Sequence, residues 1–286
     1  MSLACTLNGP LQLSVEQLPH VEPKEGQVRL RLGAGGICGS DLHYYQHGRA
    51  GAFSIRAPFV PGHEASGVVE AIGPGVTRVR PGQKVAVNPA HPCGLCPACR
   101  AGRSNLCKKM VFLGSAAIFP HLPGLFREHF VVGESQLSAV DEDVGLGEIA
   151  CAEPLSVGLH AVRRAGPLLG ATVLVTGAGT IGCMSVIAAR LAGAGRVLCS
   201  DPSDRAREMA LTVGADDAQP DTSAWQGQVD VAIEAAGHPA ALAGCLSAVR
   251  RGARIVQVGT LPPELPFPAN DIMTRELDYV GAFRAD

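Results

Sequence analysis

Four cysteines crowd into one short segment at a spacing typical of metal sites. Cys93, Cys96, Cys99 and Cys107 form the pattern C-x2-C-x2-C-x7-C in a stretch that also carries Pro and Gly. Four thiolates at this spacing suit a tetrahedral zinc ion with no open coordination position, so the site would be structural. An iron–sulfur cluster also uses closely spaced thiolates, and disulfides are a further alternative.

A second set of potential ligands is spread along the chain. It comprises Cys38, the adjacent His63 and Glu64, and Glu153. A catalytic zinc takes about three protein ligands of the S, N and O types and keeps one position for water or substrate. Taken singly, each residue also has an ordinary explanation, as a buried thiol, a core histidine or an acid at a helix N-terminus. Only their conjunction indicates a second metal site.

A glycine-rich hexapeptide directly follows the apolar run 172–176 and is expected to open a helix. In that context its three glycines allow a tight turn, the approach of a pyrophosphate to the backbone, and close packing of the helix on the strand. The hexapeptide therefore predicts a dinucleotide-binding loop. The residues expected to contact the cofactor there are Gly177, Gly179, Thr180, Ile181 and Gly182.

Asp201 ends the next predicted strand, nineteen residues after Gly182. A carboxylate at that place can accept hydrogen bonds from both hydroxyls of the adenosine ribose and would repel a 2′-phosphate, which favours NAD over NADP. Arg205 could stack on adenine or tolerate a phosphate, so NADP use stays open. The alternative is a glycine-rich turn of an unrelated α/β protein, with Asp201 a solvated strand end.

The elements that position these residues fall into two halves of different texture. Short strands are predicted at 28–32, 67–72, 84–88 and 126–132, separated by Pro and Gly turns, which indicates an irregular and mostly β domain. From about Leu168, apolar strands alternate with Ala-rich helical stretches, and this alternation predicts a parallel sheet covered by helices. The fold class is therefore α/β, with a doubly wound parallel sheet. We place the domain limits at 1–155 and 156–286.

Composition excludes several classes of partner. The chain has 286 residues, 47% of them hydrophobic, and a formal net charge of -2, without a basic run that would bind nucleic acid. No segment reaches the apolar length of a membrane-spanning helix, and no signal peptide is recognisable. We therefore expect a cytoplasmic location, where the ten cysteines stay reduced, and partners that are small molecules or a second subunit.

Taken together, the motifs resemble those of the medium-chain zinc-dependent alcohol dehydrogenases. The runs GGICGSDLHYY, PGHEASGVVEAIG, PGQKVAVNP, AEPLSVGLHA and VLVTGAGTIG occur in the order found in that family, with the four-cysteine segment between the third and the fourth. The resemblance implies a Rossmann domain behind a GroES-like catalytic domain. The acid in AEP resembles the sorbitol and polyol branch, and the loop 112–126 resembles the L-idonate 5-dehydrogenase group.

The resemblance also implies roles for particular residues. Cys38, His63 and Glu153 would hold a catalytic zinc, with Glu64 as a direct ligand or as a support for the ligands. The four-cysteine segment would hold a second zinc, giving two ions per subunit. In the adjoining segment three residues would serve the substrate, as hydrogen-bond partner of its oxygen, as proton relay and as pocket wall. They are, in that order, Ser40, His43 and Tyr44.

The family's chemistry is transfer of a hydride from a secondary alcohol to a nicotinamide, with zinc activating the hydroxyl. The strand ends predicted to face the nicotinamide carry Val258, Gly259, Phe283 and Arg284. A sugar-acid substrate needs a cationic partner for its carboxylate. The candidates are Arg49, Arg56, His121 and Arg284.

Two alternatives to an active sugar-acid or polyol dehydrogenase stay open. The chain could be an oxidoreductase of other specificity, such as a formaldehyde or simple alcohol dehydrogenase. It could also retain zinc and nucleotide without turnover, since family members run beyond the position of Asp286. In the family that further segment returns to the β domain, so its absence is expected to expose apolar surface, to favour aggregation and to disturb a homodimer or homotetramer.

Overall fold

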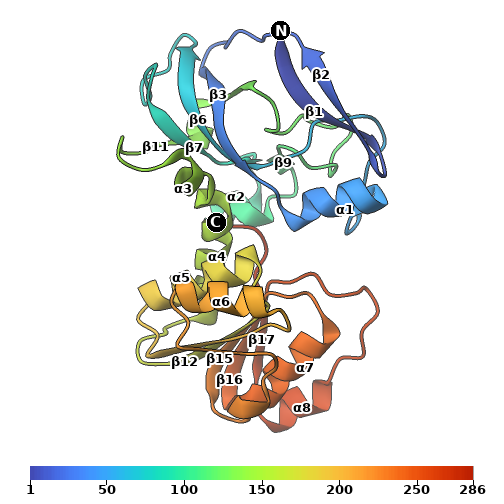
Figure 1. Cartoon of the computed structure of the whole chain (residues 1–286), viewed down its shortest axis with the longest axis vertical. Helices are drawn as coiled ribbons and strands as arrows, with labels where there is room; N and C mark the ends of the chain where they lie inside the picture. The colour runs from blue at the N-terminus through green and yellow to red at the C-terminus, as the bar shows by residue number, and fades with distance from the viewer. Residues whose placement is uncertain (286) are drawn as a thin grey trace. The chain divides into compact units, whose positions relative to one another are not determined.

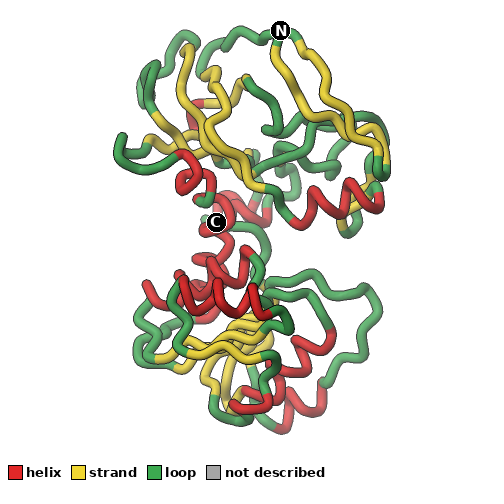
Figure 2. Tube along the Cα trace, in the orientation of Figure 1, coloured by secondary structure: helices red, strands yellow, loops and turns green. Residues whose placement is uncertain are grey.

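The computed structural model describes residues 1–285 and divides into two compact units, Met1–Glu153 and Pro154–Asp286. Each unit is described by itself. Figure 1 follows the chain through both units, and Figure 2 shows that strands dominate the first and that helices surround a sheet in the second. Among the described residues, no helix combines the length and the apolar character needed to cross a membrane.

The first unit is built around an antiparallel sheet of five strands in the order β10-β3-β6-β7-β11, beside a separate hairpin of β1 and β2. Its strands are β1 Ser2–Gly9, β2 Gln12–Leu18, β3 Gln27–Gly36, β4 Arg49–Ala50, β5 Phe53–Ser54, β6 Glu64–Ile72, β7 Lys84–Val87, β8 Ala90–His91, β9 Val111–Phe112, β10 His129–Gly133 and β11 Leu137–Ala139. Its helices are α1 Gly39–His47, α2 Pro97–Arg100 and α3 Leu146–Ala150, with 3-10 turns at Ser104–Leu106 and Glu134–Gln136.

Strict alternation along β3 explains how this sheet buries one face. Val28 and Leu30 are completely buried, whereas Arg29 and Arg31 lie on the opposite face. Successive side chains of a strand point to opposite faces, so the pattern apolar-in and basic-out follows directly from the sequence. The buried face packs on the hydrophobic core of the unit, to which Phe130 of β10 contributes.

The second unit contains a parallel sheet of six strands in the order β14-β13-β12-β15-β16-β17, with helices on both faces. Its strands are β12 Thr172–Thr176, β13 Arg196–Ser200, β14 Asp217–Gln219, β15 Val229–Glu234, β16 Val249–Gln257 and β17 Asp278–Gly281. Its helices are α4 Ala152–Ala165, which begins at the unit boundary, α5 Thr180–Leu191, α6 Asp204–Thr212, α7 Pro239–Ala248 and α8 Ala269–Thr274, with a 3-10 turn at Ser223–Trp225.

The strand order places a switch point at β12. The chain first adds β13 and β14 on one side of β12 and then returns to add β15, β16 and β17 on the other side. At such a switch point the loops at the carboxyl ends of the strands diverge and leave a crevice, which is where doubly wound sheets bind their ligands. The predicted fold class, a doubly wound parallel sheet that follows a mostly β domain along the chain, is therefore confirmed.

Two glycines of the loop after β12 are required by the backbone itself. Gly177 adopts a positive φ of 87°, and a Cβ at this position would lie 2.7 Å from the nitrogen of Ala236. A Cβ on Gly182 would collide with the carbonyl oxygen of Gly177. Any larger side chain at either position would therefore open the turn between β12 and α5.

We expect Leu174→Ala to destabilise the protein by about 2–5 kcal/mol, because Leu174 is completely buried against the α7 face of the sheet and its truncation leaves a cavity. Urea unfolding measures the change. The matched control is Leu191→Ala at the end of α5, where the side chain is 73% exposed and a change within about 0.5 kcal/mol is expected. Equal losses in the two variants would contradict this account of the core.

Candidate functional site

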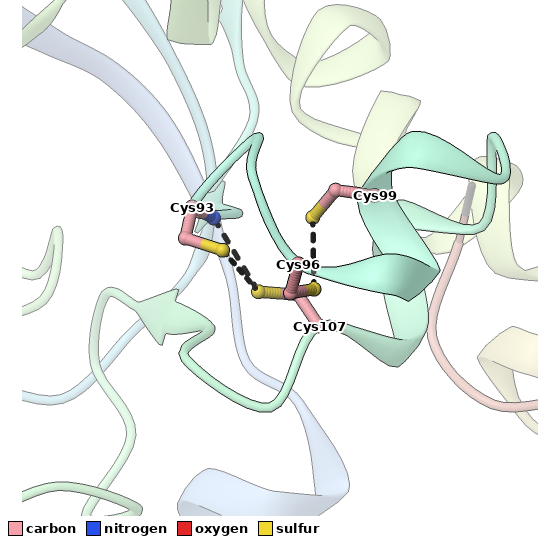
Figure 3. Close-up of side chains that lie close together, drawn as sticks. All are labelled: Cys93, Cys96, Cys99 and Cys107. Carbon is pink, nitrogen blue, oxygen red and sulfur yellow. Dashed lines mark hydrogen bonds between the residues drawn. The ribbon is translucent and has the colours of Figure 1, made fainter.

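The four cysteines of the first unit converge on one point. Their Sγ atoms all lie within 4.8 Å of one another, with 3.5 Å between Cys96 and Cys99 and 3.5 Å between Cys93 and Cys107. Figure 3 shows the four side chains turned toward one another from the loop around α2. Proline at the first position of α2 starts a helix immediately after Cys96, and this single turn brings Cys99 back toward it.

The thiols of this cluster are unequal. Backbone hydrogen bonding from Cys99 lowers the pKa of Cys96 to about 6, whereas desolvation raises the pKa of Cys99 to about 12. Thiols packed this closely cannot all ionise without a cation among them, because each thiolate opposes the next. The set of four sulfur donors on a tight loop fits a zinc ion without an open position.

Three of the four dispersed ligand candidates also meet. Cys38 immediately precedes α1, and His63 and Glu64 stand at the start of β6. The ligand atoms of these three residues all lie within 4.8 Å of one another, and His63 and Glu64 are only 7% and 6% exposed. Glu153 lies outside this 4.8 Å group. It is nevertheless close enough for the charges of His63 and Glu64 to affect its pKa.

A carboxylate that sequence reasoning missed holds the ligand segments together. Asp41, 5% exposed, accepts the backbone N–H of Cys38 at 3.0 Å through Oδ2 and that of Gly62 at 3.2 Å through Oδ1. The same Oδ1 lies 3.8 Å from Nδ1 of His63. Its position three residues after Cys38, at the start of a helix, was the available signal, since acidic residues favour the first helical turn.

Two observations test whether these residues fit a metal ion. The Nδ1 atom of His63 is buried and makes no hydrogen bond in the described structure, which is costly unless another group coordinates the ring or charges it. Gly36 lies opposite Glu64 in the β3–β6 pairing, and any Cβ there would fill the space that the Glu64 carboxylate occupies. A thiol, an imidazole and a carboxyl group directed at one point form a suitable donor set for zinc.

Burial raises the pKa values of these groups and so makes them weaker acids. It raises the pKa of the Cys38 thiol, against hydrogen bonds from Ser40, and it raises the pKa of Glu64 against the charge of His63. The pKa of Glu153 rises to about 7 for the same reason, again against His63. Proton release from such groups becomes favourable when a cation is bound among them.

The three residues expected to serve the substrate lie on α1 in different surroundings. Ser40 is half-buried and donates a hydrogen bond to the Cys38 thiol, and His43 is exposed, with its ring 5.9 Å from that of His47. Tyr44 is 2% exposed, and its hydroxyl accepts the backbone N–H of Ala116 at 3.1 Å. The Tyr44 ring packs against Phe59 in the core of the unit, and its role beside the substrate stays a prediction.

The cationic candidates also separate. His121 uses both ring nitrogens within the chain, because Nε2 accepts the backbone N–H of Arg56 at 2.9 Å and Nδ1 lies 2.8 Å from the carbonyl oxygen of Ile118. Arg49 donates two hydrogen bonds to the carbonyl of Gly51. The exposed guanidinium of Arg56 lies 4.7 Å from the centre of the Phe119 ring, an arrangement that leaves its N–H groups available.

In the second unit, Asp201 stands one residue after β13 and organises the glycine loop. Its Oδ2 accepts the backbone N–H of Ala178, and its Oδ1 accepts that of Ser203, both at 2.8 Å. Each carboxylate oxygen retains a further acceptor position for a ribose hydroxyl. Thr180 begins α5, Ile181 is half-buried beside it, and Arg205 is exposed on α6.

The loop after β16 is fixed by a second residue that sequence reasoning missed. Glu234, completely buried at the end of β15, accepts the backbone N–H groups of Ala236 and Gly237 at 3.0 and 2.8 Å. The N–H groups of Val258 and Gly259 both reach its carbonyl oxygen at 2.9 Å. An acid inside the apolar run 229–234 was the signal.

The two residues predicted beyond β17 are Phe283, 53% exposed, and Arg284, whose guanidinium lies 4.8 Å from the centre of the Phe283 ring. Arg284 adopts a positive φ of 57°. These two side chains therefore form a local stack just beyond the end of the last strand of the sheet.

Comparison with known proteins identifies both units. Residues 24–142 match the alcohol dehydrogenase GroES-like domain, and residues 180–286 match the zinc-binding dehydrogenase domain. L-idonate 5-dehydrogenase (NAD(P)(+)) of Escherichia coli strain K12 is 39% identical over 288 residues, which cover 98% of this chain and 83% of that protein. Sorbitol dehydrogenase of Bacillus subtilis strain 168 is 36% identical, over 98% of this chain and 82% of that protein.

A solved structure agrees with these sequence matches. The crystal structure of L-idonate 5-dehydrogenase from Escherichia coli superposes with a TM-score of 0.94 at 36% sequence identity, and it covers 99% of this chain and 83% of that chain.

Proposed function

Because the chain belongs to the zinc-dependent medium-chain dehydrogenase family, we propose that it oxidises the 5-hydroxyl of L-idonate to 5-dehydro-D-gluconate, with NAD as the hydride acceptor. The observation that carries the proposal is the convergence of Cys38, His63 and Glu64 within 4.8 Å, where a family dehydrogenase needs an open metal site. The sequence similarity to an L-idonate enzyme supports the substrate.

We assign zinc binding and dinucleotide binding to two separate domains. The zinc-bearing domain would comprise 1–155, so that Glu153 contributes to it as a fourth ligand or as a nearby carboxylate. The dinucleotide-binding domain would comprise 156–286 and use the loop Gly177–Gly182 with Asp201. Support comes from the ligand cluster in the first unit and from the switch point at β12 in the second.

Zinc, when bound, supplies Lewis acidity that lowers the pKa of a coordinated hydroxyl, and NAD, when bound, accepts the hydride. The residues of α1 then handle the proton. Ser40, beside Cys38, would hydrogen-bond the substrate oxygen, and the exposed His43 would pass the hydroxyl proton to solvent. Asp41 keeps Cys38 and His63 in position, because it fixes the backbone of both ligand segments.

In the second domain, the N-terminus of α5 would receive the pyrophosphate, since its backbone N–H groups are free to donate. Asp201 would accept the ribose hydroxyls with the acceptor positions that Ala178 and Ser203 leave open. The loops that hold Val258 and Gly259 would border the nicotinamide, and Glu234 would keep them in place.

A polyol dehydrogenase acting on sorbitol or xylitol is the second candidate. The 36% identity to a sorbitol dehydrogenase favours it. The hydrogen bonds of His121 and Arg49 within the chain also favour it. Of the candidate cations in the first unit, they leave Arg56 for a substrate carboxylate. The choice between L-idonate and a neutral polyol therefore depends on the Arg56 guanidinium.

Steady-state kinetics over L-idonate, sorbitol and xylitol test the proposal. We expect the highest kcat/KM for L-idonate. We also expect Arg56→Gln to raise its KM by about ten- to hundredfold with little effect on sorbitol, because one charge-assisted hydrogen bond is lost. Arg49→Gln is the matched control, since the Arg49 guanidinium already binds Gly51. A higher kcat/KM for sorbitol or xylitol would instead identify a polyol dehydrogenase.

Metal content provides an independent test, because we propose two zinc ions per chain. Elemental analysis should find two in the unaltered protein and one each in Cys96→Ser and Cys38→Ser. Loss of the four-cysteine zinc should weaken the fold, whereas loss of the other zinc should abolish turnover first. Cys151→Ser, at an exposed cysteine, is the control. One zinc in the unaltered protein together with an unchanged content in Cys96→Ser would overturn the structural site.

Cofactor choice should respond to the charge of Asp201. We expect Asp201→Ser to weaken NAD binding by about 1–3 kcal/mol through loss of charge-assisted hydrogen bonds, and to relieve the repulsion of NADP. Asp201→Asn keeps one acceptor oxygen and separates loop distortion from loss of charge. Fluorescence titration with both cofactors measures the change, with Asp204→Asn as the control. Unchanged affinities would show that Asp201 only braces the loop.

A further inference from the structure

The outer face of the β3–β10 sheet carries several basic side chains. Alternation places Arg29 and Arg31 on this face, opposite the core, and His129 of β10 stands directly across from Arg31. Arg127 precedes β10, and its segment pairs with β1 through an isolated bridge to Ala4. The β1–β2 hairpin lies beside this sheet in the first unit (Figure 1).

A cavity of about 260 Å³ opens on this face, and its lining contains donors but no acid. Its polar lining residues are Ser2, His20, Lys24, Gln27, Arg29, Arg127 and His129. The Oε1 atom of Gln27 accepts the backbone N–H of Lys24 at 3.0 Å, and Nδ1 of His129 lies 2.8 Å from Glu70. The amide NH₂ of Gln27 therefore remains as a free donor position.

Arg127 forms no ion pair with any described residue. Its Nε atom is buried and has no hydrogen-bond partner among those residues. Burial lowers the pKa of Arg127 to about 10, with no opposing carboxylate to raise it. The Arg127 side chain is half-buried, and its buried Nε–H lacks an acceptor, so an external oxyanion would bind favourably there.

The neighbouring carboxylates are already engaged. Arg29 pairs with Glu22 at 2.6 Å, and Glu70 binds His129 at 2.8 Å. Glu128, next to Arg127 in the chain, accepts the backbone N–H of Leu3 at 2.8 Å. Each of these three carboxylates would therefore have to give up an existing contact in order to pair with Arg127.

A cavity of the second unit provides the contrast. It is also lined by arginines, but Arg250 lies 2.6 Å from Asp230 and Arg254 lies 2.6 Å from Asp278. The arginines of this second cavity are thus paired, whereas Arg127 is not.

We propose that this cavity is a binding site for a small multivalent oxyanion, with the Arg127 guanidinium as its central contact and with Lys24 and His20 at its rim. The planar guanidinium suits two oxygens of one phosphate or carboxylate group. The site lies apart from Cys38, His63 and the cysteine cluster, and it does not depend on the proposed substrate.

Isothermal titration calorimetry tests the site on the zinc-loaded chain. Sodium phosphate and sodium succinate are titrated separately at a fixed ionic strength set with NaCl, so that the two arms distinguish a phosphoryl from a dicarboxylate ligand. We expect saturable binding of at least one probe and a loss of about ten- to hundredfold in affinity for Arg127→Met. Arg80→Met, at an exposed arginine, should bind like the unaltered protein.

Phosphate binding at the glycine loop of the second unit is common to all these variants. The test is therefore the difference in anion affinity between the unaltered protein and Arg127→Met. Thermal unfolding of Arg127→Met without anion controls for folding, and we expect no loss of stability because the substitution removes no ion pair. Failure of both probes to bind more tightly than about 10 mM, or equal binding by Arg127→Met, would refute the site.

Chemical modification supplies a measurement without a variant. Phenylglyoxal reacts with accessible guanidinium groups, and mass spectrometry locates the adducts. The bound probe should slow adduct formation at Arg127 by several-fold relative to NaCl alone, while Arg80 reacts at an unchanged rate. Equal rates at Arg127 with and without the probe would contradict the proposal.

Discussion

A single buried carboxylate, that of Asp41, determines whether the metal ligands of the first unit can meet. Cys38 and His63 belong to segments that leave β3 and enter β6, and these segments have no ladder hydrogen bonds of their own at the ligand positions. Asp41 accepts the N–H groups of Cys38 and Gly62, and these two hydrogen bonds take the place of strand pairing. Gly36 completes the arrangement by leaving room for Glu64. The local geometry thus depends on one acceptor and one absent side chain.

In the second unit, two further carboxylates hold loops by accepting backbone N–H groups. Asp201 and Glu234 stand at or just beyond the carboxyl ends of strands on the two sides of β12, and each accepts N–H groups from the loop beside it. Loops at a switch point have few backbone partners, because the strands they leave diverge. Carboxylates at these positions therefore give the crevice a defined shape before any ligand arrives.

Sequence reasoning succeeded where the signal is local. The run 28–32 was predicted as a strand and lies within β3, where apolar and basic residues alternate. Sequence reasoning was less accurate where contacts between distant residues determine strand limits and burial. A strand was predicted from 126, but β10 begins at His129, since Phe126 and Glu128 bond to β1. Tyr44 is buried by Phe59 and Ser115, distant residues that no motif identifies, and the isolation of Arg127 is equally non-local.

The sharing of Asp41 between two ligand segments has a thermodynamic consequence. Any cation held by Cys38, His63 and Glu64 binds the folded first unit and finds no comparable site in the unfolded chain, so its binding free energy adds to the free energy of unfolding. The contribution grows with the logarithm of the free metal concentration. The apparent stability of the chain is therefore not a constant of its sequence, because it varies with the metal supply of the surrounding solution.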